Sequence, residues 1–187
     1  MEVCDRISNE AAELSQSLIK RMDEEQENVL RRLKMFRDAV GQLADSLNDT
    51  TSEDGRFSIF CRKLEHLEQE KRELDRCFSS FLGLEVCVTE GKMRLVQWEG
   101  EVTLLANHNV SAKECVSSLV EKSQRIANKF IEYRECRQRL EKVMRSVLPR
   151  FFEELYRLSD VEHGGRGFRS QSVCAACGFV CNEIKWS

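Results

Sequence analysis

The residues that could bind a metal ion gather near the C-terminus of this sequence. Cys174 and Cys177 form a Cys-x-x-Cys-Gly motif, and Cys181 follows four residues later. Such a turn presents two thiolates to one metal ion, which is half of a structural zinc site. A complete site needs two more ligands, for which Cys181 and His163 are candidates. Because a second paired motif is missing, the sequence favours the alternative, an unfolded tail with reduced thiols.

Residues that could carry catalysis are sparse. The three histidines are His66, His108 and His163, and none is paired with a carboxylate or a second histidine in a known catalytic spacing. The sequence has no phosphate-cradling glycine loop, no nucleophile elbow and no His-Glu-x-x-His motif. The many acidic residues are those of a highly charged helical surface. We therefore expect a protein that is not an enzyme and has no catalytic residues.

A basic run could bind an anionic surface. Between Lys122 and Arg145 there are eight basic residues against three acidic ones. The basic residues are Lys122, Arg125, Lys129, Arg134, Arg137, Arg139, Lys142 and Arg145. One interpretation is a solvated face that pairs with the acidic N-terminal segment, where residues 1–49 carry eleven acidic and seven basic side chains. The other is a surface for anionic lipid; nucleic acid is not expected, because no aromatic residues are interleaved for base stacking.

A long apolar stripe over Ser111–Leu158 must position these groups. Apolar residues recur there at steps of three and four, which is the period of one face of a helix. They are Val116, Leu119, Ile126, Phe130, Tyr133, Leu140, Met144, Val147, Phe151, Leu155 and Leu158. A helix with such a stripe is not stable alone in water and must pack against other helices.

Two earlier segments supply the partner helices. One stripe begins at Ile7, a second begins at Phe57, and polar turns at 48–55 and 107–110 separate the three patterns. Short turns imply that consecutive helices fold back antiparallel. We expect helices near 3–49, 56–106 and 111–159, with these seam residues buried: Leu33, Phe36, Leu64, Phe130 and Leu140.

Two places in this pattern allow an alternative. In Leu84–Trp98, apolar and polar residues also alternate as they would in the strands of a β-hairpin. The three- and four-residue spacing of a helix nevertheless persists across Gly91 and favours a helix. Pro149 predicts a kink or a new helix start, because proline removes a backbone hydrogen bond and clashes with the preceding turn.

The apolar surface widens around Pro149. It includes Leu148, Phe151, Phe152, Leu155 and Tyr156. This is more than the third helix of a three-helix bundle is expected to bury, so we predict a partner-binding patch, with a thicker end of the bundle as the alternative.

Composition agrees with long helices. The chain has 187 residues, one third of them charged, and a single proline. The net charge of −3 does not favour a polyanionic partner. Nine cysteines are present, an odd number, and six of them are scattered through helical pattern, which favours the cytoplasm or nucleus. We expect no signal peptide and no transmembrane segment.

These observations predict an all-α protein: an elongated antiparallel three-helix coiled-coil bundle over residues 1–160 and a flexible, Cys-containing tail over residues 161–187. The expected function is that of a non-enzymatic coiled-coil scaffold or assembly subunit, a homo- or hetero-oligomer that binds other helical proteins. In helix number, helix length and glycine or proline bends, Ile7–Leu158 also resembles the BAR domains. That resemblance implies the alternative function, a dimer that binds and curves membranes.

Overall fold

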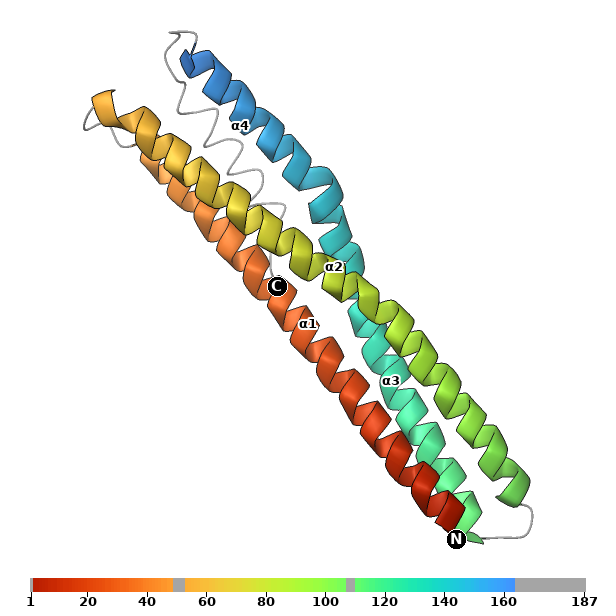
Figure 1. The fold of residues 1–187 in the computed structure, drawn as a ribbon. Helices are drawn as coiled ribbons and strands as arrows, with labels where there is room; N and C mark the ends of the chain where they lie inside the picture. Colours follow the sequence, from red (N-terminus) through yellow and green to blue (C-terminus); the bar gives the residue numbers. More distant parts are fainter. Residues whose placement is uncertain (1, 49–52, 107–109, 164–187) are drawn as a thin grey trace. The chain divides into compact units, whose positions relative to one another are not determined.

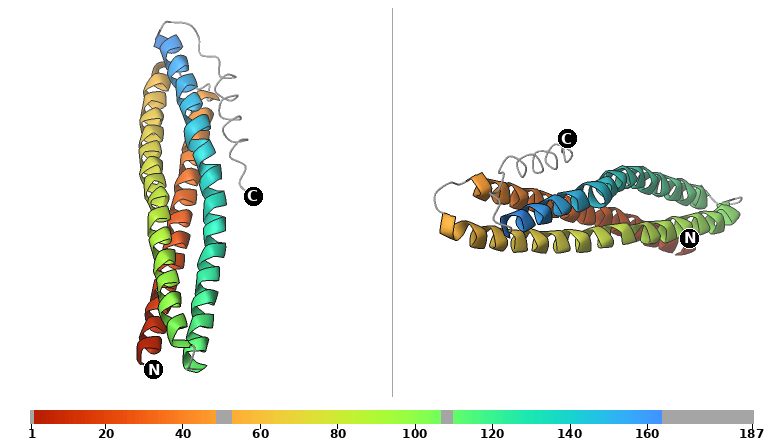
Figure 2. Two further views of the ribbon diagram at one scale, coloured as in Figure 1. Left: turned by 90° about the vertical axis from the view of Figure 1, so that its right-hand side faces the viewer. Right: turned by 90° about the horizontal axis from the view of Figure 1, so that it is seen from above.

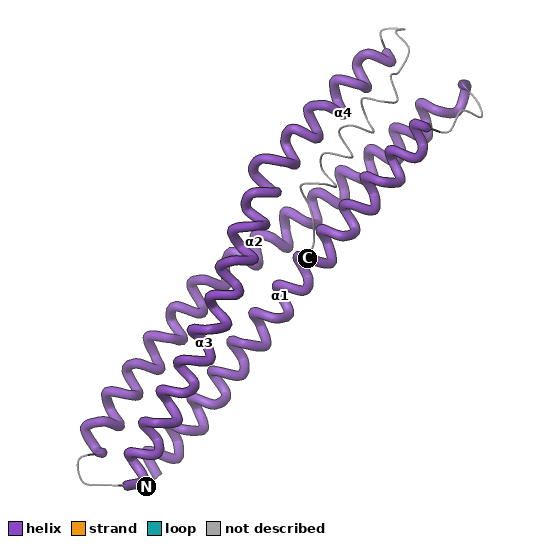
Figure 3. The backbone as a smooth tube through the Cα atoms, turned by 180° about the vertical axis from the view of Figure 1, so that it is seen from behind, coloured by secondary structure: helices purple, strands orange, loops and turns teal. Residues whose placement is uncertain are grey.

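The described part of the chain is entirely helical. The computed structural model describes residues 2–48, 53–106 and 110–163, and all of them are helical, with no strand among them (Figures 1 and 3). The elements are α1 (Glu2–Asn48), α2 (Glu53–Ala106), α3 (Val110–Lys142), the π-helical segment η1 (Val143–Val147) and α4 (Leu148–His163). Since η1 joins α3 to α4 without a gap, the described residues form three helical stretches, and the ends of these stretches lie close to the predicted ones. The prediction of an all-α helical fold is confirmed.

The helices pack into two compact units. The first comprises Met1–Asn28 with Ser79–Arg137, and the second comprises Val29–Phe78 with Gln138–Ser187. Within each unit the α1 and α2 portions run in opposite directions, and a portion of the third helical stretch lies beside them (Figures 1 and 2). The single domain over residues 1–160 and the tail from residue 161 stay predictions, and residues 164–187 lie outside the described chain.

The core of the first unit is an apolar seam shared by three helices. Its buried residues recur at steps of three and four along each helix, as an amphipathic helix requires. From α1 they are Cys4, Ile7, Ala11, Ser15, Leu18 and Met22; from α2, Phe81, Leu84, Val88, Leu95, Trp98 and Val102; from α3, Ala112, Cys115, Leu119, Ile126, Phe130, Tyr133 and Cys136.

The core of the second unit is built around Phe36. Its ring is fully buried and lies 6.3 Å from the Phe151 ring and 6.2 Å from the Phe152 ring, measured between centroids. The other residues that were predicted to be buried in the seam are buried, with one exception. Leu33, Phe130 and Leu140 are buried in their units, whereas Leu64 is only half-buried. Leu64 lies to the side of the line through the buried residues Phe60, Leu67 and Leu74, which forms the inner face of α2 in this unit.

Helix α2 continues through the stretch that could have formed a hairpin. All of Leu84–Trp98 is helical, so the helix interpretation is confirmed and the hairpin alternative is wrong. Gly91 is buried, and a Cβ atom there would overlap Cδ1 of Leu18 on α1. A Cβ atom on Gly83 or Gly100 would meet nothing within 4 Å. Gly91 therefore permits a close approach of α1 to α2, and the other two glycines do not serve this purpose.

This difference predicts opposite effects of one substitution. Gly83→Ala and Gly100→Ala should each raise the free energy of unfolding by up to about 1 kcal/mol, because alanine favours the helix over glycine. Gly91→Ala should instead lower it by about 0–2 kcal/mol, because overpacking of Leu18 costs about 1–3 kcal/mol and outweighs the helix gain. Urea denaturation of the three variants measures this. Equal stabilisation by all three would mean that the Leu18 side chain moves aside from a Cβ atom at position 91 without cost.

The third helical stretch changes its hydrogen bonding just before Pro149. The backbone N–H of Leu148 donates to the carbonyl of Val143, five residues earlier, which closes a π turn. Pro149 has no N–H group, so it cannot continue the ordinary α-helical ladder. The helical backbone runs through Pro149 without a break, because η1 joins α3 directly to α4, so the expected new start takes no other form than the π turn itself. The wider turn brings adjacent residues, Val147 with Leu148 and then Phe151 with Phe152, into the core of the second unit.

Candidate partner-binding groove

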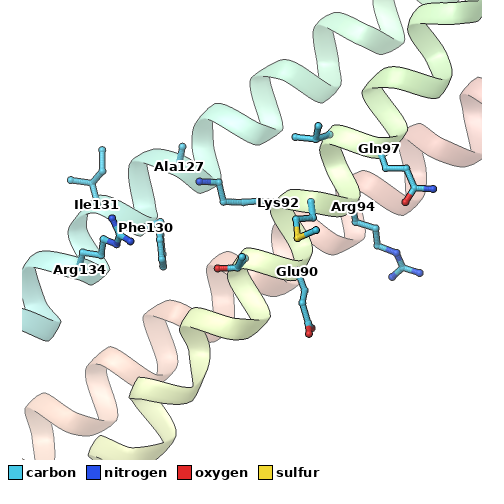
Figure 4. A pocket seen from close by; sticks show the side chains of 11 residues that line it. Glu90, Lys92, Arg94, Gln97, Ala127, Phe130, Ile131 and Arg134 are labelled. Atoms are coloured by element: carbon cyan, nitrogen blue, oxygen red, sulfur yellow. The ribbon is translucent and has the colours of Figure 1, made fainter.

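Large apolar side chains lie exposed along a groove between α2 and α3 in the first unit. Met93 and Val96 on α2 are 69% and 61% exposed, and Ile131 on α3 is 58% exposed. Together with neighbouring residues they line an open groove of about 1030 Å³ (Figure 4). Single exposed apolar residues are ordinary on a protein surface, but a contiguous group in a groove is typical of an interaction site.

The exposed apolar residues continue along both helices. Val86 and Leu104 lie seven residues before and eleven residues after Met93, and both are exposed. Val120 lies eleven residues before Ile131 and is also exposed. Because seven and eleven residues are close to whole numbers of helical turns, each set lies on one line along its helix. Both α2 and α3 thus carry a second apolar line besides the one that faces the core.

Phe130 connects this groove to the core of the unit. Its ring stacks on that of Tyr133, with centroids 5.4 Å apart and an interplanar angle of 10°. The rings of Tyr133 and Phe81 also lie together, with centroids 4.6 Å apart. The Tyr133 hydroxyl donates a 2.8 Å hydrogen bond to the Phe81 carbonyl oxygen. Tyr133 is buried, so its position is set by packing and by this bond together. Phe130 is therefore held firmly as part of the groove lining.

Two cations lie over the Phe130 ring. Nζ of Lys92 is 5.6 Å from the ring centroid, and Cζ of Arg134 is 5.0 Å from it. Figure 4 shows Lys92 extending from α2 toward α3, whereas Glu90 points away from α3. Arg134 also lies 3.6 Å from a carboxylate oxygen of Glu85, whose other oxygen pairs with Arg137. The groove near Phe130 thus combines an aromatic face with positive charge.

Sequence reasoning missed this groove. It followed one apolar stripe per helix, and Met93, Val96 and Ile131 lie beside those stripes rather than in them. The signal that could have found them is a second set of apolar residues at helical spacing, such as Val120, Ala127 and Ile131 on α3. Such a signal is weak, because isolated exposed valines and methionines are common in helices.

The predicted partner-binding patch after Pro149 lies inside the second unit. Leu148, Phe151, Phe152 and Leu155 are buried. The rings of Phe151 and Phe152 pack against Phe36. The premise that one chain cannot cover this surface is therefore wrong, because α1 supplies a large aromatic residue to fill it. The side chain of Tyr156 lies outside the described set. Partner binding at these residues stays a prediction. The apolar surface on which that prediction depended is buried.

Many residues of the basic run form ion pairs. Lys129 contacts Asp23 of α1 at 2.6 Å and Glu132 at 2.9 Å, and hydrogen bonds to these two carboxylates raise the pKa of Lys129. Arg134 contacts Glu85, and Arg145 lies 4.0 Å from Glu141. Four further basic residues were predicted to bind an anionic surface. Of these, Lys122 is half-buried, whereas Arg125, Arg139 and Lys142 are exposed. The contact with Asp23 agrees with pairing between this run and the acidic first helix.

The zinc candidates fall outside what the structure describes. Cys174, Cys177 and Cys181 belong to residues 164–187, and the side chain of His163, the last residue of α4, is likewise not described. Within the described residues, no group of three or more His, Cys, Asp or Glu side chains is arranged to hold a metal ion. The tail site stays a prediction.

One buried thiol of the first unit is unsuited to nucleophilic chemistry. The Cys115 thiol donates a 3.5 Å hydrogen bond to the carbonyl oxygen of Cys4. Burial, followed by the neighbouring Cys4, raises the pKa of Cys115. Because the thiolate is the reactive form, a raised pKa makes this cysteine less reactive at neutral pH.

Comparisons with protein-family models, with curated proteins and with solved structures found no match to this chain. The function proposed below is therefore inferred from the chain's own residues. In the described ranges, none of the helices combines the length and apolar character that crossing a membrane requires.

Proposed function

We propose that this protein is a non-enzymatic assembly subunit that binds other helical proteins by coiled-coil packing. The supporting observation is the groove between α2 and α3, where Met93, Val96 and Ile131 are exposed beside an aromatic residue. The proposal includes antiparallel three-helix coiled-coil packing within the chain, which the three- and four-residue spacing of the buried side chains supports. A helix added to the groove would bury a second apolar line in the same manner.

We also propose that the protein acts in the cytoplasm or nucleus. The six cysteines of the described helices, which are Cys4, Cys61, Cys77, Cys87, Cys115 and Cys136, are free thiols. Free thiols distributed over several helices suit a reducing compartment. Assembly into homo- or hetero-oligomers through the groove completes this proposal.

The BAR-like alternative would use the basic run to bind anionic lipid. The contacts of Lys129 with Asp23 and of Arg134 with Glu85 weaken this alternative, because they neutralise part of the positive charge of the basic run. Co-sedimentation with anionic liposomes at increasing salt separates the two functions, since binding through surface charge is screened by salt.

A double charge substitution tests the proposed function. Met93→Glu with Ile131→Glu places two carboxylates in the groove, where burying each apolar side chain would have contributed about 1.5–3 kcal/mol to binding. We expect the variant to stay folded, because both side chains are exposed. Its apparent affinity for its partners, or for further copies of itself, should fall by at least about tenfold. Pull-down from the native source and light scattering measure this.

The chain offers a matched control. Met35 and Ile59 in the second unit are 42% and 48% exposed, so Met35→Glu with Ile59→Glu makes the same chemical change outside the groove. The control should keep the partners and mass of the wild type. Retention of both by the groove variant would show that the groove is not the binding surface.

A further inference from the structure

We infer that the groove between α2 and α3 receives an amphipathic helix of another protein that carries acidic side chains beside its apolar face. This inference rests on the proposed function and specifies its partner. Lys92, Phe130 and Arg134 would recognise the acidic and apolar groups of that helix, and Met93 with Ile131 would pack against its apolar face.

The shape and chemistry of the groove favour a helix over an extended segment. Its walls are helices α2 and α3, whose backbone N–H and C=O groups are used within those helices. An extended peptide needs backbone partners, such as the edge of a sheet, and finds none here. A helix satisfies its own backbone and presents only side chains, so it can lie between two helices as the fourth member of a bundle.

The charge of the groove favours acidic residues on that helix. Lys92 and Arg134 both lie within 6 Å of the Phe130 ring centroid, while Glu90 points away from α3 (Figure 4). Glu85, 3.6 Å from Arg134, neutralises part of the Arg134 charge, so the preference for a carboxylate depends mainly on Lys92. Contact with the ring restrains the two cations near the groove, so less conformational entropy is lost when a carboxylate binds them. An apolar side chain of the partner would lie against the exposed Met93 and Ile131 beside the buried Phe130, and carboxylates on either side of it would reach the two cations.

Segments of this chain are poor occupants. The sequence 164–187 contains Arg166, Arg169 and Lys185 against the single acid Glu183, so it carries the same sign of charge as the groove. In the first unit, Val3 is the one large apolar side chain of the described α1 residues that is exposed, and Leu14 and Ile19 are half-buried, so α1 offers a second copy little apolar surface. Two grooves placed face to face would bring like charges together. These charges favour a different protein over this chain as the occupant.

Two designed peptides test the inference on the full chain. Both are amphipathic helices with the same leucine face, and they differ only in having glutamate or lysine at the flanking positions. We expect the glutamate peptide to bind at least about tenfold tighter in fluorescence anisotropy, with the difference shrinking as ionic strength rises. Lys92→Glu with Arg134→Glu should reverse this preference. Lys20→Glu with Arg125→Glu changes the same residue types at exposed sites in the same unit and should leave the preference unchanged.

The outcomes separate this inference from the proposed function. Equal binding of both peptides, abolished by Met93→Glu with Ile131→Glu, would overturn the acidic partner and leave helix binding intact. Binding that survives that groove variant would overturn the groove as the site, and with it the proposed function. Failure of both peptides to bind at high micromolar concentration overturns the inference alone. A concentration-dependent dimer that the groove variant dissociates would make a second copy the occupant and would also overturn it.

Discussion

Phe36→Ala should lower the free energy of unfolding by about 3–5 kcal/mol. The ring is fully buried and contacts the rings of both Phe151 and Phe152, so its removal leaves a cavity that several bulky neighbours border. Edge-to-face and tilted ring contacts of this kind add to the loss from reduced burial. Guanidinium denaturation followed by circular dichroism measures the change.

The neighbouring Met35 provides the control. It is 42% exposed on the same helix, so Met35→Ala should change stability by no more than about 0.5 kcal/mol. A loss below about 1 kcal/mol for Phe36→Ala would show that α4 does not pack against α1 in the second unit. The aromatic residues after Pro149 would then be accessible, and the original prediction of a partner-binding patch there would regain its basis.

Tyr133→Ala should have a comparable effect on the first unit, with a loss of about 3–5 kcal/mol. Tyr133 is buried between the Phe130 and Phe81 rings, and its hydroxyl is bonded to the Phe81 carbonyl. Tyr133→Phe keeps the ring and removes only the hydrogen bond, so it should cost about 1 kcal/mol. Denaturation of the two variants separates packing from hydrogen bonding.

The same pair of variants also tests the groove. Tyr133→Phe leaves the support of Phe130 in place, so binding of the glutamate peptide should be unchanged. If Tyr133→Phe costs as much stability as Tyr133→Ala, the hydroxyl is more important than ring packing, and the aromatic stack does not organise this unit.

The secondary structure was predictable because one strong period governs each helix. The stripe from Ile7 and the stripe from Val116 place apolar residues at steps of three and four, and the polar turns interrupt them. Leu84–Trp98 was ambiguous because alternation and helical spacing overlap in short apolar runs. The structure has this stretch as part of helix α2.

Other features depend on which helix lies opposite, and a periodic pattern does not contain that information. The aromatic residues after Pro149 looked too numerous to bury, yet Phe36 on α1 accommodates them. Glu70 lies among buried residues of α2, with Arg32 of α1 3.7 Å away, although a glutamate is expected at the surface. Met93 and Ile131 form one groove only because α2 and α3 are neighbours.

The π turn at Val143–Val147 bears on how this chain can tolerate changes in length. A π turn holds one more residue than an α turn, so deletion of a single residue there would leave a regular α-helix. Because the π turn takes up its extra residue within one turn, the residues of α4 would keep their rotational phase relative to residues 138–142 after such a deletion. The same deletion within the regular part of α3 would instead rotate every later residue by about 100° and move the buried pair Phe151 and Phe152 away from its present positions. The π turn is therefore the point at which this helical stretch can lose one residue and keep the same buried face.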